Sequence, residues 1–169
     1  MSNKTKYIAG GLTASTAFFV ALIGFEGCKP KPYLDSGKVP TIGIGSTVYE
    51  NGTKVRMTDA PITQKRAIEI SKAHVAKDEV AFRKSLTGVK LSQVEYDSYM
   101  DFVYNFGISN WNKSSMLRNL KQGKYVAACE SLLKYKYVAK KDCSIRSNNC
   151  YGVWTRQKWR YDQCMSVNK

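Results

Sequence analysis

Two carboxylates stand nine residues apart in the tract GFEGCKPKPYLDSGKVPTIGIGS, residues 24–46. Glu26 ends an uncharged run, where partial removal of water would raise its pKa and keep it protonated near neutral pH. Asp35 lies in the polar turn LDSG, where water and nearby donors favour the ionised form. One protonated and one ionised carboxyl group are what glycosidic bond cleavage needs, without metal or histidine. Because two acids at this spacing also occur by chance, residue types alone leave this chemistry as one hypothesis.

Other common hydrolytic chemistries lack their residues. The chain has one histidine, His74, in the segment SKAHVAKDE, where we interpret it as a surface residue among charges. A zinc amidase needs at least two histidines and a further ligand, so a single histidine argues against it. The tract TIGIGS has neither the lysine nor the third glycine of a nucleotide-binding loop. We therefore predict no metal and no cofactor.

The charge balance predicts attraction to a polyanion. The 169 residues suit one domain, or one domain with a short extension, and they hold 27 Lys and Arg against 13 Asp and Glu, a net charge of +14. Nucleic acid, anionic lipid and acidic cell-wall polymer would all be attracted, and solubility alone is the other explanation. We predict that Trp111, Trp154 and Trp159 fill the core rather than stack on bases, so nucleic acid is not an expected partner.

The N-terminal segment is uncharged for nineteen positions, Tyr7–Phe25, after the basic start MSNKTK. That length could just span a bilayer. The run is diluted by glycine, alanine, serine and threonine, so it would hold a membrane weakly. A cleaved signal peptide and a buried, glycine-rich helix of a soluble domain are the alternatives. Composition does not choose among the three.

Five cysteines indicate an oxidising destination. Cys143 and Cys150 bracket the polar loop SIRSNN, which a disulfide would close easily. Cys129 and Cys164 lie in helix-like segments and form a plausible second pair. Cys28 is then left over, either as a free thiol or as a small buried hydrophobe. The sequence does not fix the connectivity.

Hydrophobic periodicity and turn residues predict an α+β fold that is mostly α. Pro, Gly and Asn turns alternate with β-branched runs over residues 33–60, which predicts a small antiparallel β lobe inserted among helices. The segment SQVE at Ser92 has the form of a capping box, so a helix should begin there and stop near Gly107. The segments SSMLRNLKQG, YVAACESLLKY and VWTRQKWRYDQCM complete a helical C-terminal lobe. A long amphipathic helix should start at Thr63, its apolar positions being Ala67, Ile70, Ala73, Val80 and Leu86.

The tract FEG followed by PYLDSGKVPTIGIGS resembles the active-site segment of the phage lysozymes, the T-even phage lysozyme or endolysin family of glycoside hydrolases. The resemblance covers roughly Ala17–Met165 and implies a lysozyme-like fold. It gives Glu26 the place of the general acid, Asp35 that of the second carboxylate and Thr41 that of the threonine that helps to position a water molecule.

The same resemblance extends to YDSYMDFVYNFG, where Tyr104 and Asn105 match an aromatic residue and an amide that line the cleft. It implies a muramidase that hydrolyses, with inversion, the β-1,4 bond between N-acetylmuramic acid and N-acetylglucosamine in bacterial peptidoglycan and so lyses the host cell. A monomer is expected. A lytic transglycosylase, which needs a single acid, is the enzymatic alternative. A noncatalytic cationic binder of an anionic polymer or membrane is the other.

The weakly hydrophobic start, the tract DCSIRSNNCYG and the scattered cysteines are similar to the subgroup called signal-anchor-release endolysins. This likeness implies that residues 1–25 first tether the chain to the host inner membrane and then leave it, so that the enzyme works in the periplasm with only transient membrane contact. The catalytic domain, 17–169, overlaps that segment because a released segment must pack as a soluble helix. Cys28, two residues from Glu26, is a candidate regulatory thiol whose disulfide in the tethered form would hold Glu26 out of place.

Overall fold

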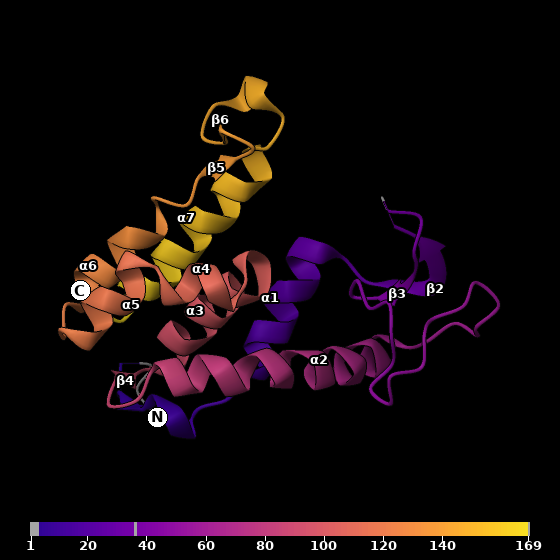
Figure 1. Ribbon diagram of the computed structural model, residues 1–169, viewed down its shortest axis with the longest axis horizontal. Coiled ribbons are helices and arrows are strands. Elements are labelled where there is room, and N and C mark those ends of the chain that lie inside the picture. Colours follow the sequence, from indigo (N-terminus) through magenta and orange to yellow (C-terminus); the bar gives the residue numbers. More distant parts are fainter. Residues whose placement is uncertain (1–3, 36, 169) are drawn as a thin grey trace. The chain divides into compact units, whose positions relative to one another are not determined.

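The computed structural model describes residues 4–35 and 37–168, which cluster into two compact units. The β-containing unit comprises residues 16–79, and the helical unit combines the first fifteen residues with the chain from residue 80 onward. The predicted class, α+β and mostly α, is confirmed. Figure 1 shows the elements in chain order.

The β-containing unit starts with helix α1, Thr16–Glu26, followed by the antiparallel strands β2, Lys29–Leu34, and β3, Pro40–Gly43. Isolated bridges join Ile42 to Ser46 and Val48 to Lys54. The pairing thus begins at residue 29, four residues before the predicted start of the β lobe. The early start is possible because both strands of a two-stranded sheet are edges, where the prolines of KPKPYL need not donate to a ladder.

Helix α2, Gln64–Ser85, is the predicted long amphipathic helix. Its buried stripe runs along one face through Ala67, Ile70, Val75, Glu79 and Phe82. The prediction was wrong for Val80, which is 63% exposed, whereas Ala73 is half-buried. Val80 lies two residues before the buried Phe82, a rotation of about 200° at 3.6 residues per turn.

His74, on the same helix, is less exposed than predicted. It is half-buried, and its Nε2 atom lies 2.8 Å from the carbonyl oxygen of Val48. The histidine therefore joins α2 to the irregular segment that follows β3.

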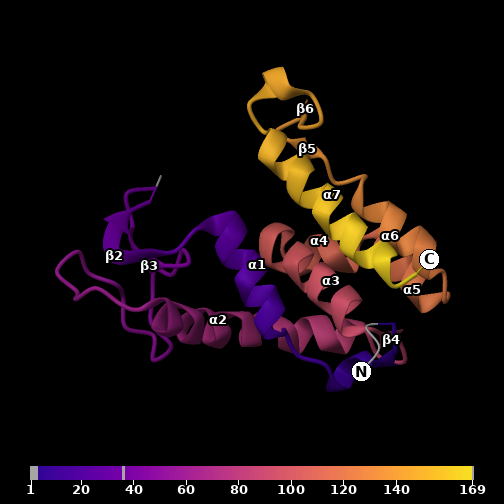
Figure 2. The same ribbon diagram turned by 180° about the vertical axis from the view of Figure 1, so that it is seen from behind.

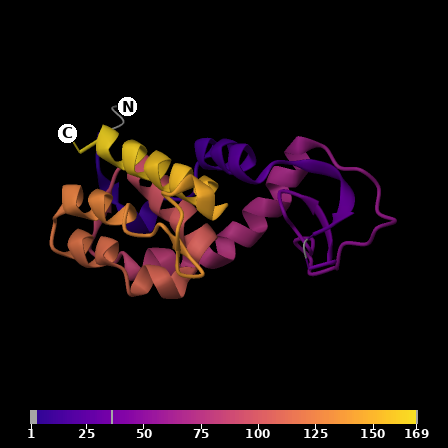
Figure 3. The same cartoon turned by 90° about the horizontal axis from the view of Figure 1, so that it is seen from above.

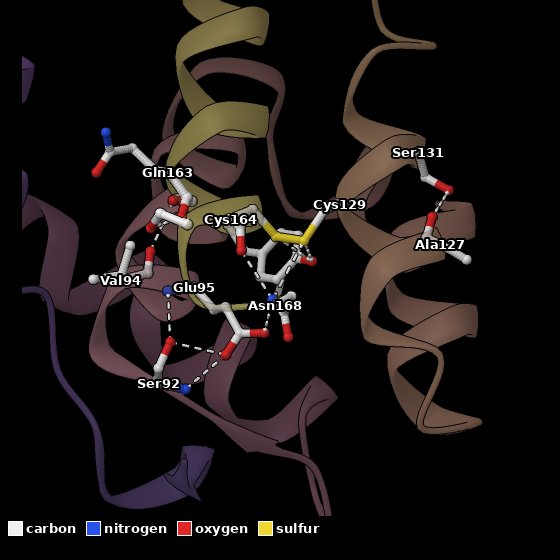
Figure 4. The surroundings of a disulfide bond; sticks show 12 residues. Ser92, Val94, Glu95, Ala127, Cys129, Ser131, Gln163, Cys164 and Asn168 are labelled. Atoms are coloured by element: carbon white, nitrogen blue, oxygen red, sulfur yellow. Dashed lines mark hydrogen bonds between the residues drawn. A yellow bond between two sulfur atoms is a disulfide. The ribbon is translucent and has the colours of Figure 1, made fainter. Parts of the chain in front are cut away.

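The helical unit is organised around α3, Gln93–Phe106, and its capping box is confirmed. The Ser92 hydroxyl accepts from the Glu95 N–H, and the Glu95 carboxylate accepts from the Ser92 N–H at 2.8 Å (Figure 4). The helix ends at Gly107, whose φ of 83° is open to glycine and strained for other residues.

Among its described residues this unit has four further α-helices: α4, Ile108–Asn112; α5, Ser115–Lys121; α6, Tyr125–Leu132; and α7, Tyr151–Ser166. Helix α7 packs against α3 and α6, and α5 packs against α6 (Figure 3). The sequence had not predicted α4, whose five residues are too few to show a period.

Of the three tryptophans, only Trp111 is a core residue, fully buried against the rings of Phe82 and Tyr99. The core prediction was wrong for Trp154 and Trp159, which are half-buried. Both lie on α7, whose buried stripe is Arg156, Gln157, Arg160 and Cys164. The tryptophans lie beside that stripe rather than on it.

The first part of the N-terminal segment, residues 4–15, belongs to the helical unit, whereas residues 16–25 lie in α1 of the β-containing unit. Strand β1, Tyr7–Ile8, pairs antiparallel with β4, Lys90–Leu91, and the short 3-10 helix η1 follows at Ala9–Gly11. The Ala9 N–H donates to the carbonyl of Val89 at 3.0 Å, and Ala9 is fully buried. In the described part of the chain, no helix has both the length and the apolar character needed to cross a membrane.

Both predicted disulfides are present. Cys129–Cys164 joins α6 to α7, and Cys143–Cys150 closes the segment that precedes α7. That segment contains a small hairpin, β5 at Tyr137–Val138 and β6 at Lys141–Asp142, and the 3-10 helix η2 at Arg146–Asn148.

Removing the two disulfides should destabilise the protein unequally. Cys129 and Cys164 are separated by 35 residues in sequence, and Cys143 and Cys150 by 7. Loop-closure entropy predicts a loss of about 4 kcal/mol for the Cys129→Ala/Cys164→Ala pair and about 2 kcal/mol for the Cys143→Ala/Cys150→Ala pair. Urea unfolding of both double variants measures the difference. Equal losses would show that loop length does not set these contributions.

Two glycines in TIGIGS provide a matched test of whether close packing around Gly43, and not only its backbone conformation, disfavours a side chain. Gly43 and Gly45 both have positive φ, 65° and 74°. A Cβ on Gly43 would lie 3.0 Å from the Cβ of Ala67, whereas one on Gly45 would have no described atom beyond its chain neighbours within 4 Å. Gly45→Ala should therefore lower the free energy of unfolding by about 1–2 kcal/mol, the cost of a left-handed alanine, and Gly43→Ala by clearly more. Similar losses in urea unfolding would contradict the close approach.

Candidate active site

The turn between β2 and β3 holds Asp35 in one orientation. Its Oδ1 atom accepts hydrogen bonds from the N–H groups of Gly37 and Val39 at 2.8 and 2.9 Å. The Asp35 N–H in turn donates to the Val39 carbonyl at 3.1 Å. The donors that the sequence led us to expect around this carboxylate are thus backbone amides of its own turn.

Thr41, on β3, is 2% exposed and lies opposite Tyr33 of β2 in the strand register. Its Oγ1 hydroxyl donates to the carbonyl oxygen of Val39 at 2.9 Å. Because that bond uses the hydroxyl hydrogen, the oxygen keeps lone pairs that can accept a hydrogen bond. The Thr41 hydroxyl oxygen therefore still has the capacity to accept a hydrogen bond.

Glu26 is the last residue of α1 and is exposed, so the expected desolvation is not found. The reason is that the buried residues of α1 end at Leu22, one turn earlier. Glu26 still shares an electrostatic environment with Asp35. Burial raises the pKa of the Tyr33 phenol, and the negative charges of Asp35 and Glu26 raise that pKa further. Both carboxylates thus lie within electrostatic range of the same side chain.

Cys28 is half-buried and, among the cysteines, carries the free thiol. It lines an open hollow of about 380 Å³ together with Ile23, Pro30 and Gln64. Burial raises the pKa of the Cys28 thiol. A raised pKa reduces the thiolate fraction at neutral pH, and the thiolate is the form that exchanges with disulfides. The regulatory role of Cys28 remains a prediction, and its surroundings favour slow exchange.

Tyr104 and Asn105 lie in the last turn of α3, in the helical unit. Tyr104 is half-buried and Asn105 is exposed. The Asn105 Oδ1 atom accepts from Arg160 Nη2 at 3.3 Å. The same guanidinium donates from Nη2 to the Asp101 carbonyl at 3.1 Å and from Nε to the Asp101 carboxylate at 2.6 Å. Asn105 is therefore positioned by a buried charged group.

Sequence reasoning missed this supporting network. Asp101 also accepts two hydrogen bonds from Arg156, at 3.0 and 2.7 Å, and both guanidinium groups are almost fully buried. The sequence does contain signs of a buried ion pair. An aspartate lies within the aromatic run YDSYMDFVYNF, and two arginines stand four residues apart in the last predicted helix, which places them on one face.

Comparison with known proteins identifies the family. The phage lysozyme family model matches residues 23–159. The endolysin of Salmonella phage P22 is 35% identical over 115 residues, which are 68% of this chain and 77% of that protein. The SAR-endolysin of Escherichia phage 933W is 27% identical over 170 residues, 93% of each chain.

The fold comparison agrees. The crystal structure of a P22 lysozyme mutant matches with a TM-score of 0.78 and 29% identity, over 91% of this chain and 99% of that one. The endolysin of Escherichia coli O157:H7 phage FAHEc1 matches with a TM-score of 0.73 and 26% identity, over 91% and 94%. The chain belongs to the phage lysozyme family and is a lysozyme-type glycoside hydrolase.

Proposed function

We propose that this protein is an endolysin that hydrolyses the β-1,4 bond between N-acetylmuramic acid and N-acetylglucosamine in peptidoglycan and so lyses the bacterial host. The observation that carries the proposal is the tract from the end of α1 to the start of β3. It holds an exposed glutamate, an aspartate fixed by its own turn and a threonine hydroxyl that can accept a hydrogen bond. Membership of the phage lysozyme family supports the same reaction.

The proposed roles follow from these environments. Glu26 donates a proton to the leaving oxygen, and a bound sugar supplies the removal of water that the free protein does not provide. Asp35 accepts a proton from a water molecule, and Thr41 accepts that water's second hydrogen bond. Direct attack by this water on the anomeric carbon gives inversion. Tyr104 and Asn105 are proposed to contact the substrate.

The proposal predicts that replacing either acid causes a large loss of hydrolytic activity. Glu26→Gln removes the proton donor while it keeps the side-chain shape, so hydrolysis of purified peptidoglycan should fall about 10²–10⁴-fold. Asp35→Ala should also abolish most activity, because no group remains to activate the water. Mass analysis of the released sugars measures both. Glu130→Gln, at an exposed site on α6, is the control and should retain full activity.

Each competing function gives a different result. A lytic transglycosylase would release anhydro sugars and would tolerate Asp35→Ala. A noncatalytic cationic binder would act on cells unchanged after Glu26→Gln and would lose its effect with added salt.

We further propose that the N-terminal segment, residues 1–25, first tethers the chain to the inner membrane and that its residues 4–15 then pack into the helical unit in the periplasm. The SAR-endolysins of phages 933W and PS119 are relatives. The docked state has specific contacts: Lys6 Nζ lies 2.5 Å from Glu95 Oε1 and 3.0 Å from Asn168 Oδ1, and 3.9 Å from the centre of the Tyr125 ring. The Ser15 hydroxyl donates to Asp97 at 2.5 Å. These contacts would be made only after release.

Replacing Lys6 should weaken the docked state. Glu95 is fully buried, so Lys6→Met leaves its charge without a cation while the apolar stem is kept. Because the lysine is 24% exposed, we expect a moderate loss of about 1–3 kcal/mol in the free energy of unfolding of the purified chain. Lys84→Met, at an exposed site on α2, is the control. Equal stability of the two variants in urea would argue that Lys6 does not hold the segment.

A further inference from the structure

A short, closed hairpin carries the most exposed apolar side chains of the C-terminal part of the helical unit. We call residues 134–151, which include β5, β6 and η2, the basic hairpin. Figures 1 and 2 show β5 and β6 extending beyond the first turn of α7. Tyr137, Val138 and Ile145 are 56%, 44% and 51% exposed. Three exposed apolar side chains within nine residues of the chain call for an explanation other than core packing.

The basic hairpin has a strong excess of positive charge. Its sequence holds five basic residues, Lys134, Lys136, Lys140, Lys141 and Arg146, against one acid, Asp142. Asp142 is paired within the hairpin. It forms an ion pair with Lys136 at 2.7 Å and accepts hydrogen bonds from the N–H and the hydroxyl of Ser144. Lys140, Lys141 and Arg146 are exposed. The surface offered to a partner is therefore cationic and apolar together.

Internal bonds fix the shape of this surface. The Cys143–Cys150 disulfide closes its base, the Cys143 N–H donates to the Lys136 carbonyl at 2.8 Å, and Asn148 Nδ2 donates to the Asp142 carbonyl at 2.8 Å. The guanidinium of Arg146 lies 4.1 Å from the centre of the Tyr151 ring. A surface held in one shape loses little conformational entropy when it binds.

The backbone at the tip of the basic hairpin has a conformation that is unusual for its residue types. Its two turn residues, Ala139 and Lys140, have φ of 47° and 66°. A two-residue turn with both φ values positive is normally built from asparagine and glycine. Strained backbone at such a place is a reason to look for a function. Here the strained turn contains Lys140, two residues after the exposed Val138.

We propose that the basic hairpin is a contact site for an anionic phospholipid bilayer. Lysine and arginine beside tyrosine and aliphatic side chains match a bilayer surface, where the charges meet lipid headgroups and the apolar groups enter the interface. Carboxylates of an acidic wall polymer would satisfy the basic residues only. Tyr137, Val138 and Ile145 would then stay in water, so the exposed apolar group favours the bilayer as partner.

Vesicle binding of the purified full-length chain tests this site. The probe is vesicles of phosphatidylethanolamine and phosphatidylglycerol, compared with vesicles of phosphatidylcholine alone. Each lysine near an anionic surface contributes about 1 kcal/mol, so Lys140→Gln/Lys141→Gln should weaken binding to the anionic vesicles by about 30-fold. Val138→Ser/Ile145→Ser should weaken it several-fold with the charge unchanged. Peptidoglycan hydrolysis should remain at the level of the unaltered chain in both.

The control is Lys113→Gln/Lys121→Gln, which removes the same charge from exposed sites on other elements of the helical unit. This control also keeps the N-terminal segment, so any binding through that segment is equal in all variants. Equal weakening by the control and the Lys140/Lys141 variant would overturn the site, because net charge alone would then explain binding. Unchanged vesicle binding in either hairpin variant would overturn it too. The proposal would also be overturned if the hairpin variants lost binding only to purified peptidoglycan, because the wall would then be the partner.

Discussion

Three buried carboxylates on α3 tie together distant parts of the helical unit. Glu95, Asp97 and Asp101 are at most 9% exposed, and each binds a different segment. Glu95 holds Lys6 and Asn168 as well as the start of its own helix. The Asp97 carboxylate accepts from Ser15, and Asp101 accepts from two arginines of α7. Removal of a buried partner leaves an uncompensated charge, so each of these interactions penalises any arrangement in which the segments that it joins are separated.

The β-containing unit achieves order by a different means. Its active-site tract depends on backbone conformation: the Asp35 carboxylate is held by amides of its own turn, and Thr41 donates to a carbonyl of the same turn. Gly43, two residues later, approaches Ala67 so closely that an added Cβ would lie 3.0 Å from the Cβ of Ala67. The candidate catalytic groups are thus positioned locally, while the proposed substrate-contacting residue Asn105 depends on a buried ion-pair network between two helices.

The sequence predicted what depends on local pattern and missed what depends on partners distant in the chain. The capping box at Ser92 and the helix end near Gly107 followed from residues whose conformational preferences are strong, and both plausible disulfide pairs are present. The exposure of Glu26 could not be predicted, because the end of an apolar run in the sequence does not show where the buried face of the helix ends. Val80, Trp154 and Trp159 failed for a related reason: hydrophobic type does not decide which side of a helix meets a neighbour. The role of Lys6 was beyond prediction, since its partners Glu95 and Asn168 are 89 and 162 residues away.

Most of the net charge of +14 lies on the exposed surface. Glu95 and Asp101 neutralise cations that are themselves buried or partly buried, Lys6, Arg156 and Arg160, so they remove little positive charge from the exposed surface. Asp142 is likewise used within the basic hairpin, where Lys136 and Ser144 lower its pKa to about 2, so it stays ionised and paired at any physiological pH. The remaining lysines are mostly exposed, and their field acts at a range of about a Debye length, close to 10 Å at moderate salt. Attraction to an anionic wall is therefore a property of the whole surface. Selective contact requires a local feature that adds apolar area to charge, and in the C-terminal part of the helical unit the basic hairpin has that combination.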